Sequence, residues 1–318
     1  MRKKLLTLFA VILLLGMFTS AYAEDNNHAN AYIRMGIGAK AMAMGGTGVS
    51  FMDNITATYW NPAALGNVKR IEFASTYTDM NLDRMFNQVA FGVPFSTGYV
   101  ALSWINAGTK DLEEYNDQGQ FMGDYNADDN NINLSVGLGR NSFKVGFSAK
   151  MYMSDIQGDT ATGYGADLGL LWEINQYMSV GAMFRDIYAE MDGEEIPTQY
   201  IPEISVHPIH GLTFAANMKM EKHSDLTKVG IGAEYWTGLG RDTEVGSNIS
   251  GISMGEKTTW AEILSDAQGG LRLGMNDGNF TAGGGLRFKM VEVNYAYITA
   301  DDESIFDDTH QISLVLRF

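Results

Sequence analysis

THQISLVLRF, residues Thr309 to Phe318, is the stretch of the chain that decides its fold. Apolar and polar side chains alternate along it with a period of two, as on a β-strand with one apolar and one polar face. The apolar set is Ile312, Leu314, Leu316 and Phe318, the polar set is Gln311, Ser313 and Arg317, and only Val315 interrupts the alternation. A strand of this kind that ends on an aromatic residue is typical of bacterial outer-membrane barrels. We therefore expect a membrane protein that has no membrane-spanning helix.

The N-terminus predicts export. Basic residues 2–4 precede an apolar stretch at residues 5–18, and Ala21-Tyr22-Ala23 matches a signal-peptide cleavage site. We assign residues 1–23 to a signal peptide and expect the mature chain to begin at Glu24, with a retained anchor helix as the less favoured alternative. No Cys follows this site, which excludes a lipoprotein. Beyond it no apolar run reaches the ~18 residues of a membrane helix, so entry into a membrane requires a closed barrel.

The composition of the chain narrows its class further. The chain has no Cys, so disulfides do not stabilise the fold, although an exported protein would be permitted them. Its 36 Gly and 5 Pro suit many strands with tight turns better than helices. The formal charge of −16 becomes −19 once the three basic signal residues are removed, and such acidity argues against a nucleic-acid partner.

Strand-like runs continue through the rest of the chain, and from Arg70 onward we can lay out fourteen of them. In the run that starts at Phe143, residues 143, 145, 147, 149, 151 and 153 form one largely apolar face, and the residues between them form the other. Barrel strands of roughly 9–11 residues show this weak, repeated signature. A soluble sandwich would alternate too, so the alternation by itself does not decide between them.

The connections between these runs favour the barrel. With the N-terminus in the periplasm, most periplasmic turns are short, for example near Phe95, Arg140, Asn175 and Phe288. The opposite set includes three long acidic loops, which are Lys110–Asn130, Ala189–Gln199 and Ala300–Asp308. This asymmetry, with an even strand count, predicts an all-β, transmembrane antiparallel β-barrel of about 14 strands at residues 67–318 in the bacterial outer membrane.

One connection does not follow this rule. Residues 238–268 are long, yet the strand count puts them in the periplasm, where we expect a periplasmic insertion. A short helix there would carry Trp260, Ile263 and Leu264 on one face as a docking surface for a partner. The alternative is a miscount by one strand in each of two places.

Charged residues on the polar strand faces predict a mixed, slightly basic lumen. Those that we single out are Lys144, Lys150, Asp167, Arg185, Arg272, Arg287 and Glu292. The favoured interpretation is an ion-pair network that holds a narrow barrel closed. The alternative is a binding site for an anionic headgroup or a carboxylate.

Catalytic and metal-binding patterns are poor. The pair His207 and His210 is separated by a Pro, which disfavours helical ligand spacing, and no G-x-S-x-G, H-E-x-x-H or phosphate-loop motif is present. The sequence therefore predicts a protein that is not an enzyme and has no metal and no cofactor.

The segment before the first strand, residues 24–66, differs from the rest. It combines Gly, Ala and Met and ends on Tyr59-Trp60-Asn61-Pro62, where small residues permit close backbone contact and the Pro favours a turn or helix start. It is either an arm on the barrel exterior or rim, or a hatch that plugs the lumen. The hatch residues that we single out are Met44, Gly45, Gly46, Tyr59, Trp60, Asn61 and Pro62.

These residues also carry a family resemblance. AMAMGG followed by DNITATYWNPAAL resembles the "MGG…DD…A…WNPAGL" opening of PorV/PorQ-type proteins, a branch of the FadL-like outer-membrane barrels. GYGADLGLLW, VGIGAEYW and the C-terminal stretch have counterparts there, so the similarity runs through the mature chain. The resemblance implies a fourteen-stranded barrel with an N-terminal hatch. The chain departs from the family at residues 238–268, where a short turn is usual.

The resemblance implies two different roles. PorV/PorQ proteins assist type IX secretion and surface attachment, which implies partners in a secretion translocon or a surface-attachment complex besides outer-membrane lipids. FadL-like relatives instead admit hydrophobic small molecules through the hatch and a lateral wall opening, which implies a hydrophobic ligand. We take assistance of secretion as the main expectation and hydrophobic transport as the alternative.

Overall fold

The computed structural model describes residues 31–80, 84–116, 118–224, 227–238, 267–300 and 308–318. The described part of the chain begins with four short helices, and strands occupy most of its remainder. The helices are η1 (Ala31–Arg34), α2 (Ala39–Met42), α3 (Ala57–Trp60) and η2 (Pro62–Asn67). None of the helices in these ranges is long and apolar enough to cross a membrane. The predicted signal peptide, residues 1–23, lies outside the described residues.

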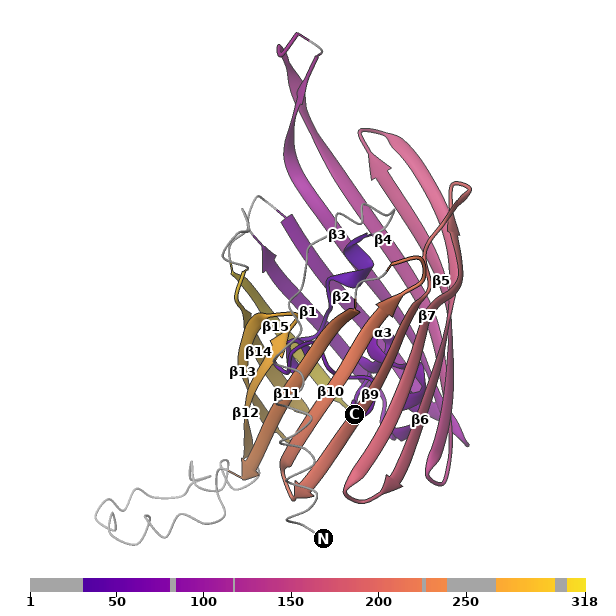
Figure 1. Cartoon of the computed structure of the whole chain (residues 1–318), viewed down its shortest axis with the longest axis vertical. Coiled ribbons are helices and arrows are strands. Elements are labelled where there is room, and N and C mark those ends of the chain that lie inside the picture. The colour runs from indigo at the N-terminus through magenta and orange to yellow at the C-terminus, as the bar shows by residue number, and fades with distance from the viewer. Residues whose placement is uncertain (1–30, 81–83, 117, 225–226, 239–266, 301–307) are drawn as a thin grey trace, which may run out of the picture.

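The strands form one closed antiparallel barrel (Figure 1). They are β1 (Glu72–Met80), β2 (Arg84–Phe95), β3 (Gly98–Tyr115), β4 (Phe121–Arg140), β5 (Phe143–Ile156), β6 (Asp159–Asn175), β7 (Met178–Met191), β8 (Glu194–Glu195), β9 (Gln199–Ile209), β10 (Leu212–Glu221), β11 (Thr227–Gly238), β12 (Ala267–Asn276), β13 (Asn279–Phe288), β14 (Val291–Ile298) and β15 (Thr309–Arg317). Each strand pairs with its neighbours in chain order, β7 pairs with β9, and β15 pairs with β1 to close the ring. Because β8 pairs only with β7, the described residues give the wall fourteen strands, as predicted.

The two faces of the wall have the polarity that the sequence predicts. On β15, Gln311, Ser313 and Val315 are buried inside the barrel, whereas Ile312 points outward and is 52% exposed. Val315, which interrupts the polar set in the sequence, packs in the apolar cluster inside the barrel. Val315 therefore belongs to the inward set with Gln311 and Ser313, and Ile312 belongs to the set that faces the membrane.

The two ends of the barrel differ in their connections. The end that we call the short-turn end carries the connections β2–β3, β4–β5, β6–β7, β9–β10 and β13–β14, each of two residues. At the opposite end, the expected loop Lys110–Asn130 is mostly strand. Beyond a bulge at Asp111, Leu112 pairs with Tyr125 and the ladder continues to Tyr115 and Phe121, whose rings pack edge to face. Continued cross-strand pairing thus turns a predicted loop into the hairpin that projects beyond the barrel in Figure 1.

The long connection at residues 238–268 joins two adjacent strands at the short-turn end. Gly238 at the end of β11 pairs with Gln268 near the start of β12, so the strand count needs no correction. Since β12 begins at Ala267, the last two residues of the expected insertion belong to the wall. The docking residues predicted there, Trp260, Ile263 and Leu264, lie outside the described residues.

A closed wall of this kind predicts heat-modifiable migration. The unheated protein should run faster than the boiled protein on a denaturing gel, because the continuous ladder keeps the barrel compact until heat opens it. Its circular dichroism spectrum should be dominated by β-structure. Identical migration of both samples, together with a largely helical spectrum, would contradict the fold.

Candidate functional site

Residues 31–68 lie inside the barrel, and we call this segment the hatch (Figure 1). Its helix η2 contacts β3, β4, β5 and β6, and α2 contacts β13, β14 and β15, so the hatch touches the wall on both sides of the lumen. Ala63, Ala64 and Leu65 are completely buried. The described segment therefore fills the lumen rather than covering the exterior of the barrel.

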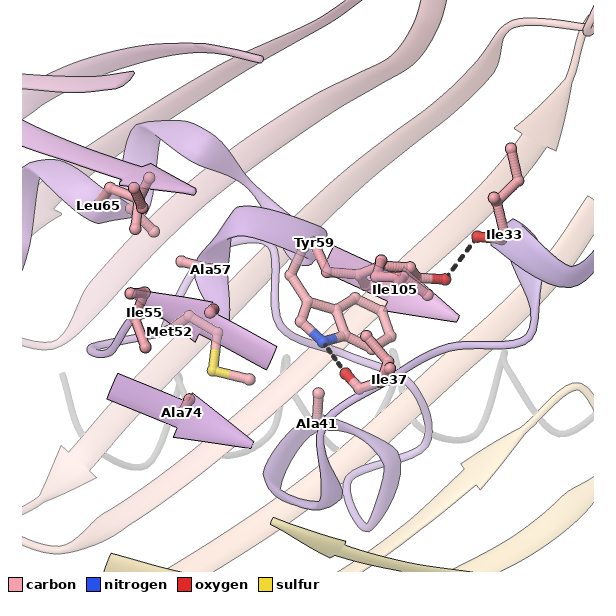
Figure 2. Close-up of a cluster of buried hydrophobic side chains, with 14 of the residues drawn as sticks. Ile33, Ile37, Ala41, Met52, Ile55, Ala57, Tyr59, Leu65, Ala74 and Ile105 are labelled. Atoms are coloured by element: carbon pink, nitrogen blue, oxygen red, sulfur yellow. Dashed lines mark hydrogen bonds between the residues drawn. The ribbon is translucent and has the colours of Figure 1, made fainter. Parts of the chain in front are cut away.

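Two adjacent aromatic residues organise the hatch (Figure 2). Trp60 donates from Nε1 to the carbonyl of Ile37 at 2.8 Å, and the Tyr59 hydroxyl donates to the carbonyl of Ile33 at 2.7 Å. The Tyr59 oxygen also accepts from the amide of Gly36 at 3.0 Å. Each ring thus buries a large apolar surface and satisfies a backbone group that the fold removes from water.

Asn61 and Pro62 connect the hatch to β5 and β6. The Asn61 Oδ1 accepts from the amide of Ala63 at 3.0 Å and caps η2, where Pro62 takes the first helical position. The Asn61 Nδ2 donates to the carbonyl of Leu170 on β6 at 3.0 Å. A Cβ at Gly169 would come within 2.0 Å of the Asn61 Oδ1, so the missing side chain in the wall makes this contact sterically feasible.

Met44, Gly45 and Gly46 bring the hatch backbone against the opposite wall. Gly45 has a φ of +71°, and a Cβ on it would lie 2.2 Å from the carbonyl oxygen of Ile231. A Cβ on Gly232 of β11 would lie 2.3 Å from the Met44 carbonyl oxygen. Glycine is therefore needed on both sides of this contact, for its backbone conformation in the hatch and for space in the wall.

Glu203 of β9 is a hatch contact that the sequence analysis missed. Its buried carboxylate accepts from the amides of Gly48 at 2.8 Å and Ser50 at 2.7 Å, and from the Ser50 hydroxyl at 2.8 Å. Asn217 of β10 donates to the same carboxylate at 3.2 Å. A single Glu in a strand gives no local signal of this role, because its partners in the hatch are more than 150 residues away in the chain.

The lumen charges near the centre of the barrel form one cluster. Lys150 contacts Asp167 at 2.8 Å and Asp186 at 2.6 Å, and Arg34 of the hatch contacts Asp186 at 2.6 Å. Arg185 donates to the carbonyl of Tyr59 at 3.0 Å and lies over the Tyr59 ring. This cluster joins the hatch to β5, β6 and β7.

A second cluster lies toward the short-turn end. The ion pairs there are Arg272–Glu234 at 2.6 Å, Arg287–Glu292 at 2.7 Å, Arg317–Glu292 at 2.8 Å, Arg317–Glu72 at 3.0 Å and Lys40–Asp53 at 2.8 Å. A separate pair joins Lys144 of β5 to Glu173 of β6. Burial lowers the pKa of Lys40, but Asp53 and the more distant Glu234 and Glu292 outweigh it and raise the pKa above its ordinary value. The buried ammonium therefore stays charged.

All seven lumen charges singled out in the sequence point inward and have protein partners. Six of them pair with an opposite charge, whereas Arg185 donates to the side chain of Gln199 and to the carbonyl of Tyr59. This arrangement favours a structural network over the binding of an anionic ligand. In the part of the chain that the structure describes, no group of three potential ligand residues could hold a metal ion.

The wall is irregular where β7 meets β9. Asp186 on β7 has a φ of +56° and lies in a bulge of the neighbouring β6–β7 ladder. In that ladder Phe184 pairs with Leu168, whereas Tyr188 pairs with Ala166. The β7–β9 ladder ends where Arg185 pairs with Gln199. Beyond that point, side chains replace part of the regular ladder.

Three hydrogen bonds hold the two sides of this interruption together. The Thr198 hydroxyl donates to the carbonyl of Asp186 at 2.9 Å, and the Ile196 amide donates to the carbonyl of Ala189 at 3.0 Å. Pro197 has no amide hydrogen, but its carbonyl accepts from Arg34 at 2.6 Å. Since Arg34 also binds Asp186, this hatch residue spans the interruption from inside.

A cavity of about 350 Å³ occupies the interruption. Its lining residues are Asp186, Ile187, Tyr188, Ala189, Glu190, Gly193, Glu195, Ile196 and Thr198. Ala189 and Ile196 also belong to the apolar cluster inside the barrel, with Tyr32 and Ile33 of the hatch and Ile105 of β3. Ala189 and Ile196 therefore belong both to the cavity lining and to the apolar cluster of the lumen.

No family model and no curated protein sequence matches the chain, but solved structures do. The P. putida toluene transporter TodX is 13% identical, with a TM-score of 0.65 over 89% of this chain and 99% of that chain. The Ralstonia pickettii toluene transporter TbuX is 16% identical, with a TM-score of 0.59 over 89% of this chain and 98% of that chain. A Pseudomonas aeruginosa FadL homologue is 10% identical, with a TM-score of 0.55 over 88% of this chain and 98% of that chain.

At these identities the likeness establishes the fold alone, which is a closed antiparallel β-barrel like those of these neighbours. These neighbours are outer-membrane barrels and not enzymes. The narrower resemblance to PorV/PorQ proteins stays a prediction.

Replacing Gly45 by Ala should loosen the hatch. The left-handed backbone costs an Ala about 1–3 kcal/mol, and the new methyl group also collides with the carbonyl of Ile231. We expect faster protease cleavage within residues 31–68 of the folded barrel and a lower thermal transition. Gly278→Ala is the matched control, because Gly278 has a φ of +91° but no neighbouring atom within 4 Å. Equal effects of the two substitutions would contradict the close contact of hatch and wall.

Deleting residues 31–65 should leave a barrel that inserts into membranes and conducts more current. The hatch fills the described lumen, so its removal frees a continuous aqueous path. Conductance of the intact and truncated chains in planar bilayers tests this expectation. Unchanged conductance would reject the plugging role.

Proposed function

We propose that this chain admits hydrophobic small molecules across the outer membrane, by way of the apolar part of its lumen and the wall interruption between β7 and β9. The observation that carries the proposal is that Ala189 and Ile196 line both spaces. This is the alternative role that the family resemblance implies.

The hatch makes an open aqueous pore the less suitable route. Its backbone contacts the wall at Gly45, and its side chains are buried against β3–β6 on the other side. A small solute would have to displace this packed segment. A hydrophobic solute within the apolar cluster around Ile33 and Ile105 would reach the wall cavity beside Ala189 by displacing the Ile196 side chain.

The charges beside this route are neutralised. Asp186 lies at the edge of the cavity, but its carboxylate is bound by Arg34 and Lys150 and by the Tyr152 hydroxyl. An apolar molecule would therefore pass beside a paired carboxylate. An isolated charge would instead hold water and disfavour the apolar molecule. Arg34 also binds the carbonyl of Pro197, so a shift of η1 would loosen the contacts across the wall interruption between β7 and β9.

The structural neighbours support this role over assistance of secretion. Two of them are described as toluene transporters, and toluene is a small apolar molecule. Assistance of secretion or surface assembly through protein partners rests on the sequence resemblance alone. Localisation to the bacterial outer membrane follows the same neighbours and the predicted signal peptide.

Narrowing the wall cavity should slow uptake of a hydrophobic solute. Ala189→Phe places an aromatic ring between the lumen and the cavity, whereas Ala182→Phe adds the same ring to the membrane face of the same strand. In bacteria without a hydrophobic-compound channel of their own, we expect the intact chain and Ala182→Phe to raise the uptake of radiolabelled toluene or oleate. Ala189→Phe should lose most of this gain.

Two results would overturn the proposal. One is an intact chain that gives no gain with either solute, and the other is an Ala189→Phe variant that transports as well as Ala182→Phe. Heat-modifiable migration of each variant checks that it forms the barrel. Affinity purification in mild detergent separates the two roles, since recovery of stable protein partners without bound lipid or fatty acid would favour secretion.

A further inference from the structure

The outer surface of the barrel has an apolar groove over β11–β14, on the face of the wall opposite to the one that the hatch contacts. Its volume is about 640 Å³. The lining consists of Tyr235, Thr237, Gly269, Gly270, Leu271, Gly284, Gly285, Leu286, Val293, Asn294 and Tyr295. The side chains with the largest exposure among them are Leu271, at 74%, and Leu286, at 62%.

The groove exists because two neighbouring rows of outward residues each contain a glycine. In one row, cross-strand pairing places Gly284 of β13 between Leu271 and Tyr295. In the next row, it places Gly269 of β12 between Thr237 and Leu286. The two glycines lie on adjacent strands, so the missing side chains leave one continuous depression rather than two separate dimples.

The floor of the groove is supported from inside the barrel. Trp236 of β11 lies behind it, and a Cβ on Gly270 would come within 2.6 Å of the indole ring. The guanidinium groups of Arg272 and Arg287 lie over this ring at 5.1 and 4.9 Å. Both arginines are held by ion pairs, so the floor is preformed and does not depend on an occupant.

The position of the groove identifies the chemistry of its occupant. It faces outward on the wall of an outer-membrane barrel, where the surrounding solvent is hydrocarbon. Its volume is within the range of small-ligand sites, and its exposed side chains are almost all apolar. A concave apolar surface in that setting is filled by a hydrocarbon chain.

The position of the groove along the barrel axis identifies the lipid that supplies this hydrocarbon chain. Tyr235 and Thr237 are close to the end of β11, Gly269 is close to the start of β12, and Leu286 is close to the end of β13. All of these ends belong to the short-turn end, which faces the periplasm in outer-membrane barrels. The leaflet at that depth consists of phospholipid.

We propose that this groove binds one acyl chain of a phospholipid as a persistent, specific lipid site. The site is separated from the wall interruption at β7–β9 by β10, and it lies toward the opposite end of the barrel. It therefore does not depend on the proposed transport role, and its test does not measure transport.

The experiment fills the groove without disturbing the wall. Gly284→Leu should be tolerated, because the only atom within 4 Å of a Cβ there is the Gly270 carbonyl oxygen at an ordinary contact distance of 3.5 Å. Ala282→Leu is the matched control, since Ala282 faces outward two residues away on the same strand and does not line the groove. Gly284→Ala adds only one methyl group and should fill the groove less than Gly284→Leu does.

Native mass spectrometry gives the readout after exchange into nanodiscs of palmitoyl-oleoyl phosphatidylethanolamine and gentle release. The intact chain and Ala282→Leu should retain one phospholipid at collision energies that strip the others. Gly284→Leu should lose that lipid, and Gly284→Ala should release it at a lower energy than the intact chain. Migration on unheated gels confirms that each variant is folded.

Three results would overturn the inference. They are no phospholipid retained by the intact chain after stripping, a Gly284→Leu variant that retains it as firmly as Ala282→Leu, and lipid A from the expression host retained in its place. The first two would make the groove indistinguishable from the ordinary lipid shell of the barrel, and the third would contradict its assigned leaflet.

Discussion

The whole structure depends on one constraint, which is that a wall in hydrocarbon must satisfy its backbone hydrogen-bonding groups from within. Fourteen strands meet this constraint by pairing in a ring, with β15 returning to β1. The regular β7–β9 ladder stops at Arg185 and Gln199. There, Thr198 and Arg34 supply side-chain hydrogen bonds in place of ladder bonds. A wall held by side chains is easier to open than one held by a ladder, because side chains can change rotamer without moving a strand.

The lumen solves a second problem, which is how to bury charge. Most inward charges lie in pairs that bridge strands or join the hatch to the wall, such as Lys150 with Asp167 and Arg34 with Asp186. Removing one partner of a buried pair typically costs 3–5 kcal/mol, because the other charge is then left uncompensated. Paired charges and apolar residues meet at the interrupted wall. Asp186, which Arg34 and Lys150 bind, lines the same cavity as Ala189 and Ile196 of the apolar cluster.

Glycine has different uses on the two faces of the same strands. Inward glycines such as Gly232 and Gly169 let the hatch backbone and Asn61 approach the wall. Outward glycines such as Gly284 leave the membrane face hollow over β11–β14. The alternation of a strand sends neighbouring positions to opposite faces, so a run such as Gly283 to Gly285 affects both.

The sequence by itself determined the class of protein, the strand number and the orientation of most side chains. These properties follow from a period of two and from loop lengths, both of which are local. It also indicated which charges face the lumen, because strand alternation assigns Arg272 and Glu292 to the polar face. The tertiary structure alone decided what those residues contact. Three features join segments that are adjacent only once the barrel has closed and its register is set. They are the hydrogen bonds from the hatch to Glu203, the contacts of Arg34 with Asp186 and Pro197, and the groove at Gly284. Local patterns specify faces, whereas partners across the lumen or along a row of strands depend on closure, which no local pattern contains.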